Sequence, residues 1–429
     1  MKAERGITRR RALGLGAAAG FVAAAETLRR SPSAAAAERR PANRSAAARR
    51  STAAAANAPF TFVSVPDFFN SDVADLRGLQ SWQPGCPNSI NNAWIRATDV
   101  CLDEVEAEQP DAVFVAGDLV EGWWDHDDGN NQLFGPVRTD KEKLAAIQVA
   151  GHQYYSYWKS LWSQRGLPVY PAVGDHEIGD DRLTTKPVNE RWPAGSFRLR
   201  AVPTFKQTWA KAFPMAGLPH PVGTGAAGTA HAADFPGLRL VTVDMFTVTP
   251  DGVQLDVRDG QLTWLERMIT SAATPVIVQG HVPVLWPVRR LRSGGLHVPA
   301  AADSGFWTML RTHRDRVPLF LCGEVHDITA IADPRGPVQI CHGRLFQYGF
   351  NYLVGHIDGA TITLKSRRVE LVRRDATSTL WGVADVKRPA ALIEYSRGAG
   401  TIGTMTVQNG AVTERSGTLD VATELGWPY

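Results

Sequence analysis

The sequence is poor in cysteine, and its cysteines lack the spacing of metal ribbons and redox centres. The 429 residues include four cysteines. None forms a C-x-x-C pair, which argues against a zinc ribbon or a thioredoxin-type site. Cys322 and Cys341 could lie on neighbouring strands and form a disulfide, or both could be small buried apolar side chains.

Net charge and long apolar runs are also lacking. The formal net charge is +3, which is close to neutral for this length and gives no reason to expect nucleic acid or a membrane surface as a partner. The apolar stretch that ends near Ala25 is too short and too weakly apolar for a stable membrane span. We therefore expect no nucleic-acid partner and no stable membrane span.

An address signal is predicted at the N-terminus. Arginines at Arg9 and Arg10 follow Thr8 and precede an Ala/Gly-rich apolar stretch, a pattern typical of twin-arginine signals. We expect residues 1–28 to be a signal peptide that the twin-arginine machinery reads, so that the protein is exported to the periplasm, cell surface or medium. The alternative is a chance arginine cluster in a tail biased toward Arg and Ala.

The composition after this segment changes twice. Residues 29–58 are rich in Ala, Arg and Ser and bury too little apolar surface to order themselves, so we interpret them as a linker. Apolar residues make up 44% of the chain, enough for a large core, which we place in residues 59–374. Residues 375–429 have short strand and turn patterns and predict a small β-rich C-terminal appendage.

Short apolar runs that end in an acid or a histidine recur along residues 59–374. Such runs are typical of strands buried on both faces. The predicted strands are Phe60–Pro66, Ala112–Ala116, Val169–Val173, Leu238–Val243, Pro275–Gln279 and Pro318–Cys322. Helical patterns separate them, at Asn91–Glu108 and after Asp259, which we expect to cap a helix. Alternating strands and helices predict an α/β fold, in which ligands bind at the carboxyl ends of the strands.

Four short motifs stand at these strand ends. They are GDLVE at 117–121, GDHE at 174–177, VQGH at 278–281 and GEVH at 323–326. In order and spacing the set resembles the calcineurin-like metallophosphoesterases, including the purple acid phosphatase-like branch. The resemblance covers about Phe60 to Arg373 and implies a four-layer αββα sandwich that carries two divalent metal ions at one edge.

The resemblance also implies a set of site residues. The metal ligands would be Asp67, Asp118, Asp175, His281, Glu324 and His326. Asp118 would bridge the two ions, and His176 would act on the leaving group or the phosphoryl oxygens as a proton donor. The implied reaction is hydrolysis of a phosphomonoester or phosphodiester by a metal-bound hydroxide, with a small phosphorylated molecule as substrate.

This sequence departs from the family pattern at three positions. First, Phe69 replaces the histidine of the D-x-H motif, and the tyrosine that fills this role in the purple acid phosphatase branch is absent because Glu121 stands in its place. Asp175 replaces the asparagine of GNHE, and Glu324 replaces the first histidine of GHxH. Carboxylates suit manganese or magnesium, which we favour over zinc, calcium or iron.

Each of these assignments has an alternative. Asp72 rivals Asp67, Glu324 could support another ligand, and Glu121 could be either a ligand of the first metal or a solvated loop acid. Asp244 also ends a predicted strand, but a structural role is favoured.

Other residues have simpler interpretations. His126, Asp127 and Asp128 fit a polar loop, and Arg289, Arg290 and Arg292 could face an anionic substrate or solvent. The three departures leave open a non-catalytic binding protein of the same fold, and hydrolysis of another ester by the same site is a third interpretation.

Replacing Arg9 and Arg10 with Lys should stop export, because twin-arginine signals require the guanidinium pair and not merely its charge. Fractionation of an expressing culture measures this. The matched control exchanges Arg29 and Arg30 for Lys in the linker and should export normally. Normal export of the first variant would contradict the signal assignment.

Overall fold

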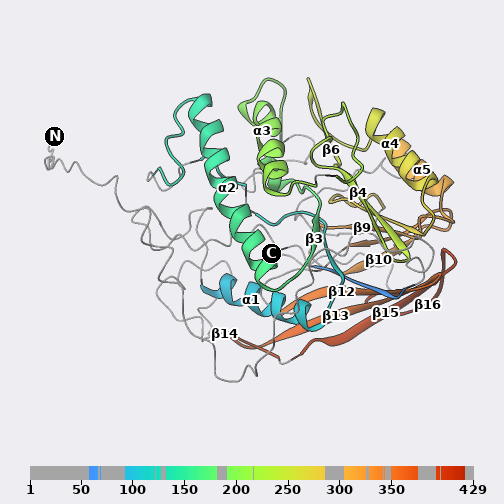
Figure 1. The fold of residues 1–429 in the computed structure, drawn as a ribbon. Helices are drawn as coiled ribbons and strands as arrows, with labels where there is room; N and C mark the ends of the chain where they lie inside the picture. Colours follow the sequence, from blue (N-terminus) through green and yellow to red (C-terminus); the bar gives the residue numbers. More distant parts are fainter. Residues whose placement is uncertain are drawn as a thin grey trace, which may run out of the picture. The chain divides into compact units, whose positions relative to one another are not determined.

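Two large β-sheets organise the fold of this computed structural model (Figure 1). The structure describes residues 58–65, 68, 92–120, 122–126, 132–180, 191–215, 217–285, 304–324, 328–341, 343, 349–374, 393–396 and 398–420. All of them belong to one compact unit, Ser51–Tyr429.

The larger sheet has eight strands and combines the first strands of the chain with the last. Its order is β16-β15-β13-β12-β1-β2-β3, and β14 pairs with β13. Strands β1, β2 and β3 run parallel, and the remaining pairs are antiparallel. The strands are β1 Phe60–Ser64, β2 Ala112–Val115, β3 Val169–Pro171, β12 Gly349–Asp358, β13 Thr361–Arg374, β14 Ile393–Tyr395, β15 Gly400–Gln408 and β16 Ala411–Gly417.

The smaller sheet has six strands in the order β10-β11-β9-β8-β5-β4. Its central strands β5, β8, β9 and β11 are parallel, and the edge strands β4 and β10 are antiparallel to their neighbours. These strands are β4 His231–Phe235, β5 Leu238–Thr242, β8 Val276–Gln279, β9 Leu319–Cys322, β10 Thr329–Ala332 and β11 Val338–Cys341. A separate hairpin joins β6 Phe246–Thr249 to β7 Gly252–Leu255.

Successive residues of the central strands face two different cores. Phe62 and Phe114 from the larger sheet share one core with Leu240 and Leu319 from the smaller sheet, so this core lies between the sheets. The alternate residues of these strands, whose side chains point to the opposite face, belong to a second core that they share with buried residues of the helices. They include Val63, Val113, Val241 and Phe320. The strands are therefore buried on both faces, as the expected four-layer sandwich requires.

Five α-helices and a short 3-10 helix, η2, connect the strands within the described residues. They are α1 Asn92–Ala107, α2 Asp140–Gln164, α3 Phe197–Ala212, α4 Asp259–Thr270, α5 Gly305–Thr312 and η2 His176–Ile178. Helix α2 begins with a capping box, in which the Thr139 side chain accepts from the Glu142 backbone and the Glu142 side chain accepts from the Thr139 backbone. None of the described helices is both long and apolar enough to cross a bilayer.

The predicted strands and the helix at Asn91–Glu108 are confirmed, with ends one or two residues shorter. The aromatic run around Trp158 lies buried in α2 as a stripe. The capping role of Asp259 is wrong. Arg258 has the extended N-cap backbone and makes no side-chain cap, and Asp259 is the first helical residue. Its charge still lies in the first helical turn, where the helix dipole favours an anion.

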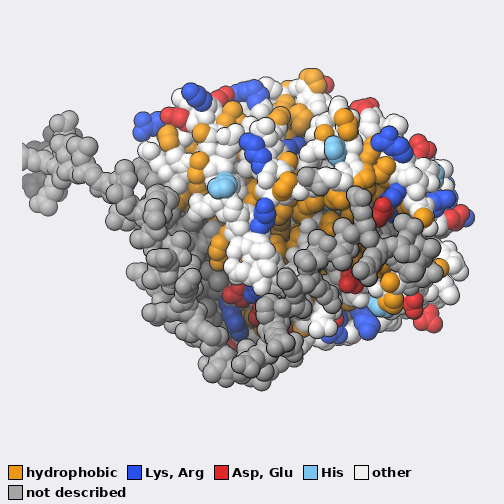
Figure 2. Space-filling view, viewed as in Figure 1, with side chains coloured by type: hydrophobic (Ala, Val, Ile, Leu, Met, Phe, Trp, Pro, Cys, Tyr) orange, Lys and Arg blue, Asp and Glu red, His pale blue; other side chains and the backbone are white. Residues whose placement is uncertain are grey.

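The C-terminal β portion extends the larger sheet, because β15 pairs with β13 and β16 with β15. Cys322 and Cys341 lie opposite each other on β9 and β11, buried and without a disulfide, and a hydrogen bond joins their Sγ atoms at 3.2 Å. Charged side chains of both signs are interspersed over the described part of the face in Figure 2. This pattern agrees with the small net charge.

Candidate metal centre

Four of the predicted ligands come together at the carboxyl ends of four parallel strands. Asp118 follows β2, Asp175 follows β3, His281 follows β8 and Glu324 follows β9. Their candidate ligand atoms all lie within 4.8 Å of one another. All four strands neighbour another strand that ends at the cluster, β2 beside β3 and β8 beside β9, so the sheet topology itself brings the ligands together in two pairs.

His281 is the centre of this cluster. Its Nε2 lies 3.0 Å from Asp175 Oδ1 and 3.4 Å from both Asp118 Oδ2 and Glu324 Oε2. All four residues are buried, and the His281 side chain has no exposed surface. One imidazole nitrogen therefore faces three carboxylates away from water.

The opposite edge of the His281 ring fixes its tautomer. Nδ1 lies 2.8 Å from the carbonyl oxygen of Ala116, and since a carbonyl can only accept, Nδ1 carries the proton. In the neutral ring Nε2 then has a lone pair that points at the three carboxylates. This is the arrangement by which a supporting carbonyl orients a histidine toward a metal ion.

The electrostatics of the cluster call for a cation. Both carboxylate oxygens of Asp175 and the Nε2 of His281 are buried without a hydrogen bond of acceptable geometry, an expensive state for a charge unless a cation neutralises it. Burial raises the pKa of Asp175, but the charges of His176 and His281 outweigh it and hold that pKa below its usual range. Burial likewise lowers the pKa of His281, but Asp118 and the other carboxylates raise it well above its ordinary value. The donor set therefore fits a divalent ion.

The backbone is bent to bring these groups together. Asp118 and Glu324 have φ angles of 57° and 68°, in the left-handed region that residues with a side chain seldom adopt. Such conformations persist only where the surrounding structure enforces them, and they cluster at functional sites. Gly174 allows the loops to approach, since a Cβ there would lie 2.1 Å from Asp118 Oδ1.

Glu177 ties two of the ligand loops together. Its Oε2 accepts hydrogen bonds from the backbone N–H groups of Asp118 and Gly174, and its Oε1 accepts one from Leu119, each at 2.7 Å. The Leu119 carbonyl in turn accepts from the indole N–H of Trp158 in α2. The loop that carries Asp118 is thus held from both sides.

His176 borders the cluster at the start of η2. Its Nε2 lies 3.9 Å from an oxygen of Asp175 and 3.9 Å from an oxygen of Asp180. The side chain is 10% exposed, so a molecule that reaches the cluster could touch it. Its backbone N–H donates to Asp118 Oδ1 at 3.3 Å, which fixes its place beside the proposed bridging ligand.

Arg191 supplies a positive charge that the sequence did not reveal. Its guanidinium pairs with Asp180 and lies 3.6 Å from Asp175 Oδ2. The carboxylate that replaces the family's asparagine is therefore partly compensated. Glu177 could have been found from its place in GDHE, but the Asp180–Arg191 pair has no recognisable spacing.

Two other predicted ligands, Asp67 and His326, lie outside the described residues, as do Phe69, Glu121 and Asp72. Asp127, Asp128, Arg289, Arg290 and Arg292 do as well. The metal-binding and loop roles assigned to all of these remain predictions.

The structural interpretations of His126 and Asp244 agree with their contacts. His126 pairs with Asp125 and stacks on Trp123. Asp244 accepts hydrogen bonds from Thr229 and from the backbone of Phe246, and it pairs with Lys206.

Comparisons with known proteins agree with this site. The calcineurin-like phosphoesterase family matches residues 73–327, more than half of the chain. No curated protein matches the sequence.

Several solved structures are similar to the chain at low identity. A dimetal phosphatase from Danio rerio is 13% identical, with a TM-score of 0.44 over 72% of this chain and 96% of that one. A 5'-nucleotidase from Candida albicans is 11% identical, with a TM-score of 0.34 over 77% of this chain and 54% of that one. Vps29 complexed with zinc, from Entamoeba histolytica, is 10% identical, with a TM-score of 0.27 over 72% and 92%. Values this low do not assign a substrate.

Replacing Glu177 with Gln should destabilise the fold by about 1–3 kcal/mol, because the amide nitrogen would face a backbone N–H and leave it without an acceptor. Urea unfolding measures the change. Glu106→Gln on the exposed face of α1 is the matched control and should change stability by less than about 0.5 kcal/mol. Equal stability of the two variants would contradict the role given to Glu177.

Proposed function

Because the chain belongs to the calcineurin-like phosphoesterases, we propose that it hydrolyses a phosphomonoester or phosphodiester with the help of bound divalent metal ions. The observation that carries the proposal is the convergence of Asp118, Asp175, Glu324 and His281 within 4.8 Å of one another in a buried site. Three buried carboxylates around one imidazole carry more negative charge than a single protonated ring can neutralise, and a divalent ion would neutralise the rest.

These four side chains would hold the metal ions, and Asp67 and His326 would complete the ligand set. We propose two ions, with manganese or magnesium preferred over zinc, calcium or iron because carboxylate oxygens dominate the set. When bound, such ions lower the pKa of water and neutralise phosphoryl oxygens. The family's purple acid phosphatase-like branch remains a proposal, and without its tyrosine we expect a colourless protein.

The chain's own groups would orient the ester and move a proton. The carboxylates of Asp175 and Asp180, each 3.9 Å from His176 Nε2, favour a positive charge on that ring. A ring held there can donate a proton to the departing oxygen. The Asp180–Arg191 pair holds Asp175 in place. The Arg191 guanidinium is mostly buried, so we propose that it positions Asp175 and does not contact the substrate.

Export through the twin-arginine pathway also remains a proposal, and it is supported only by the residues at the N-terminus. It would place the reaction outside the cytoplasm. A non-catalytic binding protein is the alternative for the site itself. Asp175 and Glu324, which replace family residues, favour it, whereas their convergence with Asp118 and His281 favours a working metal centre.

Replacing His176 with Ala should lower kcat by about 10²–10⁴-fold, the usual contribution of a positioned proton donor, with little loss of metal. The substrates are 4-nitrophenyl phosphate and bis(4-nitrophenyl) phosphate, tested with Mn²⁺, Mg²⁺ and Zn²⁺, and elemental analysis gives metal content. His152→Ala on the exposed face of α2 is the matched control and should match wild type.

Loss of metal in parallel with activity would show that His176 is structural. A wild-type protein that binds metal but turns over neither ester with any ion would favour the non-catalytic alternative.

A further inference from the structure

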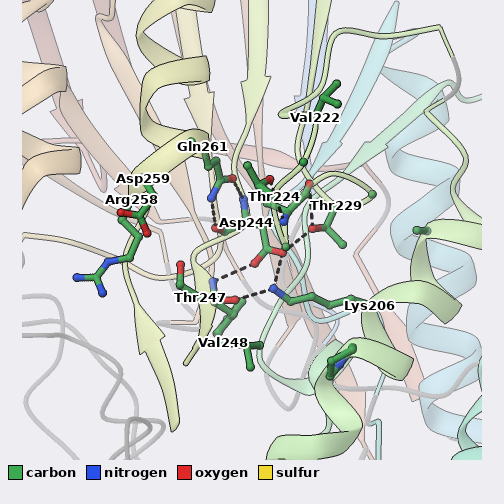
Figure 3. Close-up of a pocket in the computed structure, with 18 of the residues that line it drawn as sticks. Lys206, Val222, Thr224, Thr229, Asp244, Thr247, Val248, Arg258, Asp259 and Gln261 are labelled. Atoms are coloured by element: carbon green, nitrogen blue, oxygen red, sulfur yellow. Dashed lines mark hydrogen bonds and ion pairs between the residues drawn. The ribbon is translucent and has the colours of Figure 1, made fainter. Parts of the chain in front are cut away.

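A pocket of about 740 Å³ is lined by residues that do not belong to the metal cluster (Figure 3). It is built by α3, the glycine-rich turn at 222–229, the segment from Asp244 to Val248 and the first turn of α4. The volume is in the usual range for small-molecule sites.

A hydrogen-bond network forms the polar side of this pocket (Figure 3). Asp244 pairs with Lys206 at 2.7 Å, and Lys206 also donates to the Phe246 carbonyl at 2.6 Å. The Gln261 side chain makes two hydrogen bonds to the Asp244 backbone: its amide oxygen accepts from the N–H, and its amide nitrogen donates to the carbonyl. These bonds fix the side chains before any ligand arrives, which lowers the entropy cost of binding.

The network has donors to spare. An ammonium carries three N–H groups, and Lys206 has two acceptors among the described residues. The Gln261 amide nitrogen donates once and has a second N–H. A ligand that offers acceptor oxygens would therefore complete the network.

The charges around the pocket balance. Lys206 is paired with Asp244. Arg258 lies next to Asp259 and directs its guanidinium to Gln254 and Asp256. Because the positive and negative groups cancel, the pocket favours neither an anion nor a cation. Its polar groups are suited to hydrogen bonds with an uncharged ligand.

Two apolar side chains complete the lining. Val222 is 80% exposed and Val248 is 40% exposed, and they are two of the four large apolar side chains that the described residues expose. A ligand that carries both hydroxyl groups and a hydrocarbon face, as a sugar ring does, would satisfy the polar side and cover these valines.

Phe246 links the pocket to the metal cluster. It lines the pocket, and its ring centroid lies 6.3 Å from that of His281. The strands β5 and β8, which lead to Asp244 and His281, are direct neighbours in the sheet. The pocket and the metal cluster therefore lie at the same edge of this sheet, with the buried Phe246 ring between them.

We propose that this pocket binds the uncharged, hydroxyl-bearing part of the phosphate ester, a group of about the size of a sugar ring. The proposal rests on the proposed function for the phosphoryl end of the substrate. The binding of the uncharged group itself does not, so the two can be tested separately.

Gly225 offers a way to fill the pocket without disturbing the network. It lines the pocket, a Cβ there meets no atom within 4 Å, and its φ is not in the left-handed region. Gly225→Trp should therefore block the pocket and fold normally, and Gly225→Ala is the matched control. Val222→Trp blocks the pocket from a second position.

The first measurement uses methyl α-D-glucopyranoside and full-length protein, with binding followed by ligand-observed NMR. Loss of two or more hydrogen bonds should weaken binding by at least about tenfold in both Trp variants, and Gly225→Ala should bind like wild type. Equal binding by wild type and both Trp variants would overturn the pocket assignment.

The second measurement compares glucose 1-phosphate with methyl phosphate, which has no group to place in the pocket. Gly225→Trp should raise KM for glucose 1-phosphate by about tenfold and leave kcat/KM for methyl phosphate unchanged. An equal effect on both esters, or none on either, would overturn the link to the substrate. No turnover of any ester by wild type would contradict the proposed function, while the glucoside measurement would still decide whether the pocket binds an uncharged group.

Discussion

The structure depends on a concentration of buried negative charge around one histidine. Asp118, Asp175 and Glu324 face His281 Nε2 at 3.0 to 3.4 Å. Removing a carboxylate from water costs several kcal/mol unless a cation offsets the lost hydration. Arg191 compensates part of this charge from the side of Asp175. The negative charge that Arg191 does not compensate lies at the centre of the cluster, where a divalent ion would bind.

The fold meets this demand through strand topology. Parallel strands β2, β3, β8 and β9 end at one place, and their ends carry the ligands. Left-handed backbone at Asp118 and Glu324 turns these side chains inward, and Glu177 joins two of the loops through backbone N–H groups. Helix α2 holds the Asp118 loop through the bond from Trp158 to Leu119. Local strain at the ligands is thus balanced by hydrogen bonds and packing around them.

Much of this could be predicted from the sequence, for identifiable reasons. Asp118 and His281 follow apolar runs and stand next to glycine, so strand ends and ligands could be located together. The helix cap at Asp259 was wrong because backbone geometry, which residue type does not determine, put the extended residue at Arg258. The Arg191 pair and the pocket beside Phe246 depend on contacts between distant segments, for which no local pattern exists. Hairpin β6–β7 and helix α3, which border that pocket, were not predicted although each has a local signal, Pro250-Asp251-Gly252 at the turn and Ser196 at the start of the helix.

The most direct test of the account is the amount of Mn²⁺ bound per folded chain, measured by equilibrium dialysis and elemental analysis in wild type and Asp118→Asn. Asp315→Asn, at an exposed position, is the matched control. If the carboxylate cluster is a metal centre, wild type and the control bind Mn²⁺ equally, and Asp118→Asn loses at least about tenfold in affinity, in line with the loss of one charged ligand. Equal Mn²⁺ binding by all three folded proteins would contradict the assignment of this cluster.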